Sequence, residues 1–275
     1  MNPLVTGMLG FGLLTGAAIT SADAQGRAAD FNWHGTVAAG QWVEVKGVNG
    51  QVRAEPTTGP EVEIVGTWRG RDEDDGVVVQ AVRNEGGGVT VCALYRSVRG
   101  IRTPDCSPGA GWNGSNDGFR TSIDFVVKVP AGVHFLGATV NGDVTAMDMP
   151  ADAIASTVNG RVRVSAAGVV EASTVNGNID AEMGSADPDH DLSFNSVNGS
   201  VTIGLPADFR ARVRLSSRGR VTSDFPLESS GRRARYGPTT TRLEGEIGGG
   251  GEDLEVSTLN GSIALRRGGT GRADL

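Results

Sequence analysis

The chain has 275 residues, which is enough for one large β domain or two ordinary ones, and a net charge of −7 at pH 7. Glycine is abundant at 42 residues while aromatic residues make up only 5%, a composition typical of a turn-rich β protein with small interior side chains. The acidic balance argues against a nucleic-acid partner, because nucleic-acid-binding domains normally present a basic face.

The first 24 residues resemble a secretory signal peptide. An apolar run from Leu4 to Ile19 precedes Ser21-Ala22-Asp23-Ala24, a small-residue cleavage site, although no Lys or Arg precedes the run. The run is shorter than the roughly 20 residues that a membrane-spanning helix needs. We therefore expect export, no membrane span in the mature chain, and a leader over residues 25–40.

A short repeat centred on Asn-Gly organises most of the remaining chain. From Asn141 onward the steps between copies are 18, 17, 22 and 20 residues, and a last step of 42 equals two steps of about 21. A degraded copy stands at Arg218-Gly219 within this series. The repeat corners are Asn49, Asn141, Asn159, Asn176, Asn198 and Asn260.

The residues on both sides of each Asn-Gly alternate in polarity. Counted from the Asn, positions −6, −4, +3 and +5 are mostly apolar, position −2 is mainly Thr or Ser, and position +2 is polar in every intact copy. This alternation predicts two strands per copy, each with one buried face, and a water-facing residue at +2. We attribute the Asn-Gly itself to a corner that needs positive φ, which Gly adopts freely and Asn tolerates.

Two all-β architectures satisfy this pattern. One is a meander or sandwich of β-hairpins, and the other is a single-stranded β-helix, or solenoid, in which successive Asn residues stack into a ladder. The shared residue identities favour the solenoid, because stacked coils place equivalent positions on top of one another. A second marker, Pro-Ala at Pro130, Pro150 and Pro206, is expected at the other corner of the coil.

The expected domain organisation follows from these patterns. Residues 41–130 form a less regular N-terminal β section continuous with the repeats, residues 131–267 form the β-repeat region with a polar insertion at 226–240, and residues 268–275 form a disordered tail. Strands within the N-terminal section are predicted at Glu61–Val65, Val77–Val82, Val89–Leu94 and Ser122–Val127.

The two cysteines, Cys92 and Cys106, are 14 residues apart. In an exported protein an even pair typically forms a structural disulfide, and closing a loop of this length contributes about 3 kcal/mol. Free thiols are the alternative. A metal site needs more ligands than these two residues supply.

The Thr-Val-Asn-Gly-x-Val coils resemble the DUF4097 family of bacterial β-strand-repeat proteins, which are labelled as candidate adhesins. The stretch from Leu243 through the Gly248–Gly251 run to Ile263 is especially similar to the end of that family's domain. The resemblance covers roughly residues 40–267. It implies a β-helix-like fold, a location in the periplasm or at the cell surface of a bacterium, and no enzymatic activity, and it supplies no catalytic motif.

No catalytic motif stands out from the residues themselves either. His34, His134 and His190 lie in separate segments without ligand or triad spacing, and no nucleophile elbow, phosphate loop or zinc motif is present. Two acidic clusters, 72–75 and 187–191, have oxygen ligands that suit Ca²⁺, but solvated loops are the preferred interpretation. We therefore expect no enzyme, no metal and no cofactor.

One basic stripe is a candidate binding surface. Arg210, Arg212 and Arg214 alternate with apolar residues, and Arg218 and Arg220 follow. Such a stripe either keeps the outer face soluble or contacts anionic envelope polymers.

The favoured function is a non-enzymatic binding scaffold of the envelope, with an envelope glycan or a surface protein as partner. The alternatives are a carbohydrate-active β-helix lyase or glycosidase and a structural stress-response component of the envelope.

Overall fold

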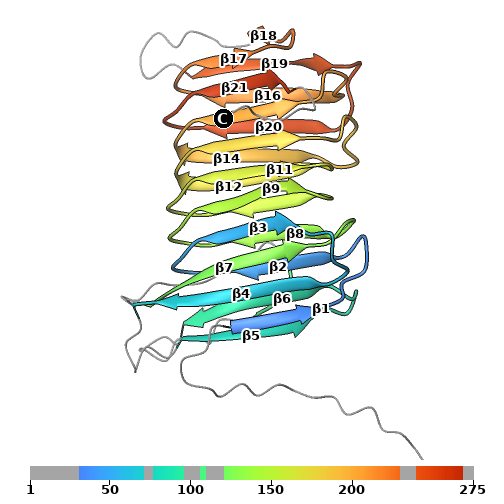
Figure 1. Ribbon diagram of the computed structural model, residues 1–275. Coiled ribbons are helices and arrows are strands. Elements are labelled where there is room, and N and C mark those ends of the chain that lie inside the picture. Colours follow the sequence, from blue (N-terminus) through green and yellow to red (C-terminus); the bar gives the residue numbers. More distant parts are fainter. Residues whose placement is uncertain (1–30, 71–76, 96–105, 110–120, 230–239, 269–275) are drawn as a thin grey trace, which may run out of the picture.

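The computed structural model describes residues 31–70, 77–95, 106–109, 121–229 and 240–268 (Figure 1). The predicted signal peptide, the acidic cluster at 72–75, most of the insertion at 226–240 and residues 269–275 lie outside the described residues. None of the described segments forms a helix long and apolar enough to cross a membrane.

The fold is all-β and consists of two sheets, whose strands run side by side along the stack in Figure 1. Sheet A contains, in spatial order, β1 (Phe31–Gly35), β4 (Val62–Arg69), β7 (Ser122–Val129), β3 (Val52–Pro56), β9 (Val144–Met149), β11 (Val162–Ala166), β13 (Ile179–Met183), β15 (Val201–Leu205), β21 (Ile263–Arg267) and β17 (Val221–Ser223). Sheet B contains β18 (Glu228–Ser229), β19 (Thr241–Ile247), β16 (Ala211–Ser217), β20 (Asp253–Thr258), β14 (Leu192–Asn198), β12 (Val170–Asn176), β10 (Ala153–Ser156), β8 (His134–Ala138), β2 (Trp42–Lys46), β6 (Val89–Tyr95) and β5 (Val77–Arg83).

Each central coil contributes one strand to sheet B and the next strand to sheet A. Neighbouring coils pair in parallel and in register, as in β10 with β12 and in β11 with β13. A hairpin would instead pair the two strands that flank one Asn-Gly antiparallel to each other. The predicted solenoid is therefore confirmed, and the hairpin meander is excluded.

The Asn residues form a continuous ladder at the corner that leads from sheet B to sheet A. The side-chain amide of each Asn donates to the Oδ1 atom of the Asn one coil earlier, at 2.7–2.8 Å in all five steps from Asn49 to Asn260. Two residues before the corner Asn, the position −2 hydroxyls are buried. Thr157 donates to the carbonyl oxygen of Gly142 at 2.8 Å, and Thr258 donates to that of Gly199 at 2.7 Å. These hydroxyls satisfy corner carbonyls that have no ladder partner of their own.

The reason for glycine at this corner differs from our expectation. No corner Asn has positive φ, since Asp148 is the one non-glycine residue with that backbone geometry among those described. Gly50 and Gly142 have φ of 120° and 156°, but the later corner glycines are not in this region. A Cβ added to Gly177 would instead collide with the carbonyl oxygen of the corner glycine one coil earlier. Close stacking of the backbones therefore requires glycine along this corner.

The interior between the sheets is filled by the apolar offsets identified in the sequence. Valine, alanine and isoleucine dominate it, with Phe125, Phe135, Phe194 and Phe209 as its largest fully buried apolar side chains. The Pro-Ala sequences lie where sheet A strands return to sheet B, between β7 and β8, β9 and β10, and β15 and β16. They mark the second corner, as predicted.

The coils do not stack in chain order at the C-terminal end. β20 pairs on one side with β14 and on the other with β16, and β21 likewise lies between β15 and β17. Arg218-Gly219 lies between Asn198 and Asn260 in the chain, but it does not lie between them in the stack. Ser217 aligns with Thr258 and Val221 with Ile263, so this coil has one corner residue fewer and no ladder Asn. It consequently suits the outer end of the ladder.

Antiparallel strands cover both ends of the stack. At the N-terminal end β4 pairs antiparallel with β7 and β1, and β5 pairs antiparallel with β6. At the other end β19 pairs antiparallel with β16 and β18. The four strands predicted within residues 41–130 are all present. Residues 31–35, however, form β1 and are not part of a leader, because alternate side chains of β1 pack against β4.

The disulfide between Cys92 and Cys106 is confirmed, with a Cα–Cα distance of 5.7 Å. It holds residues 106–109 over the outer side of β2. There Lys46 Nζ donates to the carbonyl oxygens of Ser107 and Gly109 at 2.6 Å each and lies 3.2 Å from Glu44. Glu44 in turn accepts from the Gly109 backbone amide at 2.9 Å. Lys46 is only 1% exposed, so residues 106–109 form a tight cover over this end of sheet B.

Candidate functional site

The outer face of sheet B carries side chains in four rows that run along the stack. Each row collects one offset from the corner Asn, because the strands are in register. Row −7 contains Trp42, His134, Asp152, Val169, Asp191 and Asp253. Row −5 contains Glu44, Leu136, Ile154, Glu171, Ser193 and Glu255. Row −3 contains Lys46, Ala138, Ser156, Ser173, Asn195 and Ser257. Row −1 contains Val48, Val140, Val158, Val175, Val197 and Leu259.

Row −7 brings together an aromatic ring, a histidine and a carboxylate. The Trp42 and His134 rings stack with centroids 4.9 Å apart and an interplanar angle of 25°. His134 Nδ1 lies 3.0 Å from Asp152 Oδ2, while Asp152 Oδ1 accepts from the Val169 backbone amide at 2.8 Å. Neither the stacked pair nor this contact was expected from the sequence. Listing offset −7 for each copy would have aligned these three side chains.

A second histidine, His190, lies near these rows, in the segment that precedes β14. His190 Nδ1 is 2.7 Å from Asp189 Oδ1, and His190 Nε2 is 3.8 Å from Glu171 Oε1. The hydrogen bond to Asp189 raises the pKa of His190 above its usual value, with charge attraction from Asp189 and Glu171 adding to it and partial burial opposing it. The same hydrogen bond lowers the pKa of Asp189. The pair therefore favours a charged imidazole at this edge.

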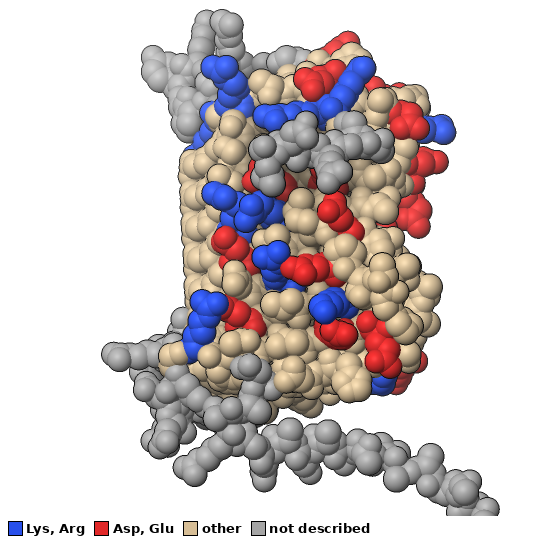
Figure 2. Space-filling model, viewed as in Figure 1, with Lys and Arg blue, Asp and Glu red and all other residues tan. Residues whose placement is uncertain are grey.

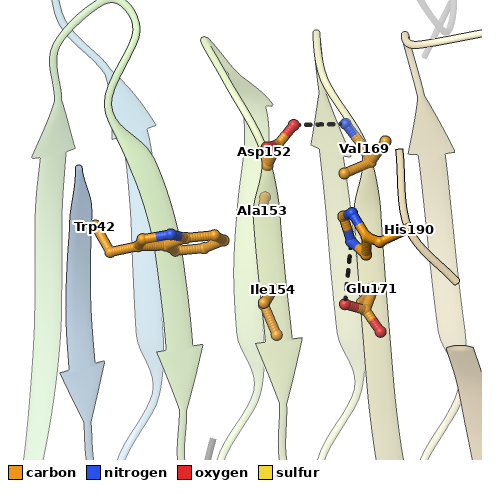
Figure 3. Close-up of a pocket in the computed structure, with 7 residues that line it drawn as sticks. All are labelled: Trp42, Asp152, Ala153, Ile154, Val169, Glu171 and His190. Atoms are coloured by element: carbon orange, nitrogen blue, oxygen red, sulfur yellow. Dashed lines mark hydrogen bonds and ion pairs between the residues drawn. The ribbon is translucent and has the colours of Figure 1, made fainter. Parts of the chain in front are cut away.

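Between these groups lies a small pocket of about 30 Å³ (Figure 3). Trp42 lines one side and His190 the other, with Ile154 on the strand between them. Two carboxylates, Asp152 and Glu171, also line it, but both are engaged with neighbouring groups. Glu171 Oε2 accepts from the backbone amide and the hydroxyl of Ser193 at 3.3 and 3.2 Å. The pocket is too small for a sugar ring, since typical ligand sites have volumes of about 300–1,000 Å³.

A larger hollow of about 490 Å³ follows rows −3 and −1 across five coils. We call it the Val–Ser groove; it is lined by Ala138, Ser156, Ser173, Asn195 and Ser257 from row −3, by Val140, Val158, Val175 and Val197 from row −1, and by the position −2 residues between them. Val158, Val175 and Val197 are each 38% exposed, and Leu259 continues their row at 42%. Large aliphatic side chains thus recur at the surface on successive coils, next to a row of hydroxyl and amide groups.

The Val–Ser groove is bounded at both ends. At the N-terminal end Lys46 occupies row −3 next to Ala138 and is covered by residues 106–109. At the other end the coil without a ladder Asn places Arg218, an exposed side chain, beyond Leu259. The apolar row therefore ends where the regular coils end.

The predicted basic stripe lies at the C-terminal end of this face. Arg212 and Arg214 project from β16 and are both exposed, as the alternation predicted, but they share one carboxylate. Asp253 lies 2.7 Å from Arg212 Nε and 2.9 Å from Arg214 Nη1. These contacts lower the pKa of Asp253 and raise the pKa of Arg212. The remaining members, Arg210, Arg218 and Arg220, are exposed.

The face of the molecule drawn in Figure 2 has no large area of one charge sign. Lys and Arg side chains lie among Asp and Glu side chains over most of that face. Opposite charges also pair within the described residues, as in Lys128 with Glu63 at 3.2 Å and Arg53 with Glu55 at 2.7 Å. A strongly charged partner therefore finds no extended complementary surface there.

Within the described residues, no three His, Cys, Asp or Glu side chains are arranged to hold a metal ion. Of the two acidic clusters in the sequence, the one at 187–191 lies within the described residues. Asp189 contacts His190, and Asp191 accepts from the Asp253 backbone amide at 2.9 Å. His34, the third histidine, lies on β1 beside Glu61 at 3.6 Å and is largely exposed.

Comparison with known proteins gives little beyond this geometry. No family model matches the chain, and no curated protein matches it. Among solved structures, a candidate cell adhesion protein from Clostridium sporogenes ATCC 15579 aligns with 10% sequence identity and a TM-score of 0.41, over 87% of this chain and 100% of that one. A likeness of this extent carries no inference about function.

Proposed function

We propose that the protein is an exported, non-enzymatic β-repeat scaffold that binds a component of the bacterial envelope through the outer face of sheet B. The observation that carries this proposal is the pair of rows −3 and −1, which present similar side chains on successive coils from Ser156 to Leu259. Exposed aliphatic residues at regular spacing on a soluble face are typical of an interaction surface. The resemblance of the coils to DUF4097 candidate adhesins points in the same direction.

The export component is supported by two features of the chain. The N-terminal 24 residues resemble a signal peptide, and the disulfide between Cys92 and Cys106 is typical of an oxidising compartment. Fractionation of cells that express the tagged full chain should find the processed protein outside the cytoplasm. Recovery of an unprocessed chain in the cytoplasm would refute export.

Binding is tested with the mature protein and purified envelope fractions, namely cell-wall polysaccharide and membrane-depleted surface protein. We expect one fraction to retain the wild type and to release a variant with Ser173→Arg on the outer face of sheet B. The matched control is Thr202→Arg, which places the same side chain on the outer face of sheet A. Equal retention of both variants would place the binding surface elsewhere, and no retention of the wild type would contradict the scaffold proposal.

The alternative, a carbohydrate-active enzyme, has one observation in its favour. Asp152 and Glu171 line the same pocket, and glycoside hydrolysis commonly uses two carboxyl groups. Their hydrogen bonds to neighbouring groups and the small pocket weigh against this role. Release of reducing sugar from envelope glycan by the wild type, lost in Asp152→Asn, would overturn the non-enzymatic proposal.

The basic stripe is proposed to add a contact for anionic envelope polymers. Because Asp253 already neutralises part of the charge of Arg212 and Arg214, we expect this contact to be weak and sensitive to salt. Replacing Arg210, Arg212 and Arg214 together by serine should reduce binding to an anionic glycan such as heparin. Unchanged binding would remove the stripe from the proposal.

A further inference from the structure

We propose that the Val–Ser groove binds an uncharged linear polysaccharide that lies along the stacking axis, across the coils. This inference rests on the proposed scaffold function and names its ligand class and its binding residues. It concerns a different part of sheet B from the basic stripe and from the pocket beside Trp42.

The groove lining is uncharged throughout. None of the residues that form it is ionisable; its members are Ala, Val, Ser, Thr and Asn. A charged polymer would lose hydration in this groove without gaining an opposite charge, which is unfavourable. The lining therefore selects for a neutral ligand.

The groove can recognise a ligand through side chains alone. It lies on the face of a sheet whose backbone groups are already paired between coils. For example, the Thr157 backbone amide donates to the Ser173 carbonyl oxygen at 3.0 Å, and the Thr139 amide donates to the Ser156 carbonyl oxygen at 3.1 Å. A peptide strand binds most readily by adding to a free sheet edge, and this surface offers none.

The lining of the groove recurs on each coil along the stacking axis, so the ligand that fits it best also repeats along that axis. Neighbouring strands are about 4.8 Å apart, so five coils extend the groove over roughly 19 Å. Each coil from Ser156 to Ser257 supplies a hydroxyl or amide group beside an aliphatic side chain. A sugar ring presents an apolar C–H face next to hydroxyl edges, which matches this pairing at every step.

The exposed aliphatic area is too small for a folded partner. Val158, Val175 and Val197 are each only 38% exposed, and a stable protein interface buries about 800 Å² on each partner. A second copy of this chain that docked through this row alone would bury much less area than a stable interface needs. A thin polymer, in contrast, needs only the groove itself.

The test is retention of the mature protein on insoluble neutral polysaccharides, with microcrystalline cellulose and chitin as probes. Heparin–agarose reports on the basic stripe instead, so retention on it should be the same for the groove variants and the wild type. We expect retention on at least one neutral probe, and a loss of at least tenfold in affinity when Val158 and Val175 are both replaced by aspartate. The milder pair Val158→Thr and Val175→Thr keeps the shape and β-propensity of the side chains, and should weaken binding by a smaller factor.

The control is Val126→Asp, because Val126 is also 38% exposed but lies on β7, on the outer face of sheet A. It should bind like the wild type, and circular dichroism should show that all variants remain folded. Three results would each overturn the inference. The wild type could fail to bind either neutral probe, the groove variants could bind as well as the wild type, or the wild type could form a dimer that Val175→Asp dissociates. Retention on an envelope fraction that is insensitive to the groove variants would refute this inference alone and leave the scaffold proposal standing.

Discussion

Replacing Asn176 by alanine tests how much the Asn ladder stabilises the stack. The Asn176 side chain donates to Asn159 Oδ1 at 2.7 Å and accepts from Asn198 Nδ2 at 2.8 Å, so alanine removes two hydrogen bonds. A hydrogen bond contributes a net 0.5–1.5 kcal/mol, roughly, and the partners left behind are exposed enough to bind water. We therefore expect the free energy of unfolding to fall by about 1–2 kcal/mol.

The matched variant is Asn260→Ala, which removes one ladder bond, the donation to Asn198 at 2.8 Å. Asn260 also belongs to a coil with a neighbour on each side, so the two variants differ chiefly in the number of ladder bonds lost. Urea unfolding monitored by circular dichroism should show about half the destabilisation of Asn176→Ala. Equal losses for the two variants, or no loss for Asn176→Ala, would refute the view that the ladder amides stabilise the fold.

Three further results are expected. Gly177→Ala should destabilise the protein strongly, because the added Cβ collides with the corner backbone one coil earlier. Gly59→Ala should be nearly neutral, because a Cβ there meets only ordinary contacts. Thermal unfolding compares the two variants, and similar melting temperatures would contradict the steric argument. Lys46→Met should cost about 3–5 kcal/mol in urea unfolding by leaving a buried carboxylate unpaired, and a loss below 1 kcal/mol would show that the ion pair is dispensable. NMR titration should give His190 a pKa above 6.5, and this pKa should fall in Asp189→Asn. The stabilisation that the raised pKa provides is complete below pH 6.5 and is lost as the pH rises through the pKa of the folded state. An unchanged pKa in the variant would exclude Asp189 as the cause.

The strands and their inward faces could be predicted because apolar and polar residues alternate along each strand. Alternation around each Asn-Gly identified the buried offsets, and the shared identity of the Asn predicted the ladder that joins Asn49 to Asn260. These features depend on local spacing and on equivalence between copies. Both are visible in one sequence.

The order of the last coils could not be read from spacing. Step length says how far apart two copies are in the chain, but not which copy is adjacent in space. The missing ladder Asn at Arg218 was the available signal, since a coil without this residue fits best at the end of the row. The role of Gly177 was likewise hidden, because close approach between coils depends on the stacked backbones and not on local turn geometry.

The outer face was only partly predictable. The alternation correctly placed Arg212 and Arg214 on one exposed face, but their shared partner Asp253 lies about 40 residues away in the chain and reaches them through the inserted coil. The grouping of Trp42, His134 and Asp152 also required the register between strands. A valine of row −1 stands in every Val-Asn-Gly copy, and from the sequence alone an apolar residue is expected to be buried. Val48 is buried, whereas Val158, Val175 and Val197 are exposed.

The insertion of the last coil also has a consequence for how the chain reaches its native state. A solenoid stacked in chain order can grow one coil at a time as the polypeptide emerges. Here β16 can pair with β19, but residues 211–223 join the regular stack only through residues 253–267, which must first take their place against β14 and β15. Assembly of this end therefore waits for contacts that close loops of about 40–60 residues, which are slow to form. A chain that is cut short before residue 253 would leave β14 and β15 as open sheet edges, exposed to proteases and to aggregation.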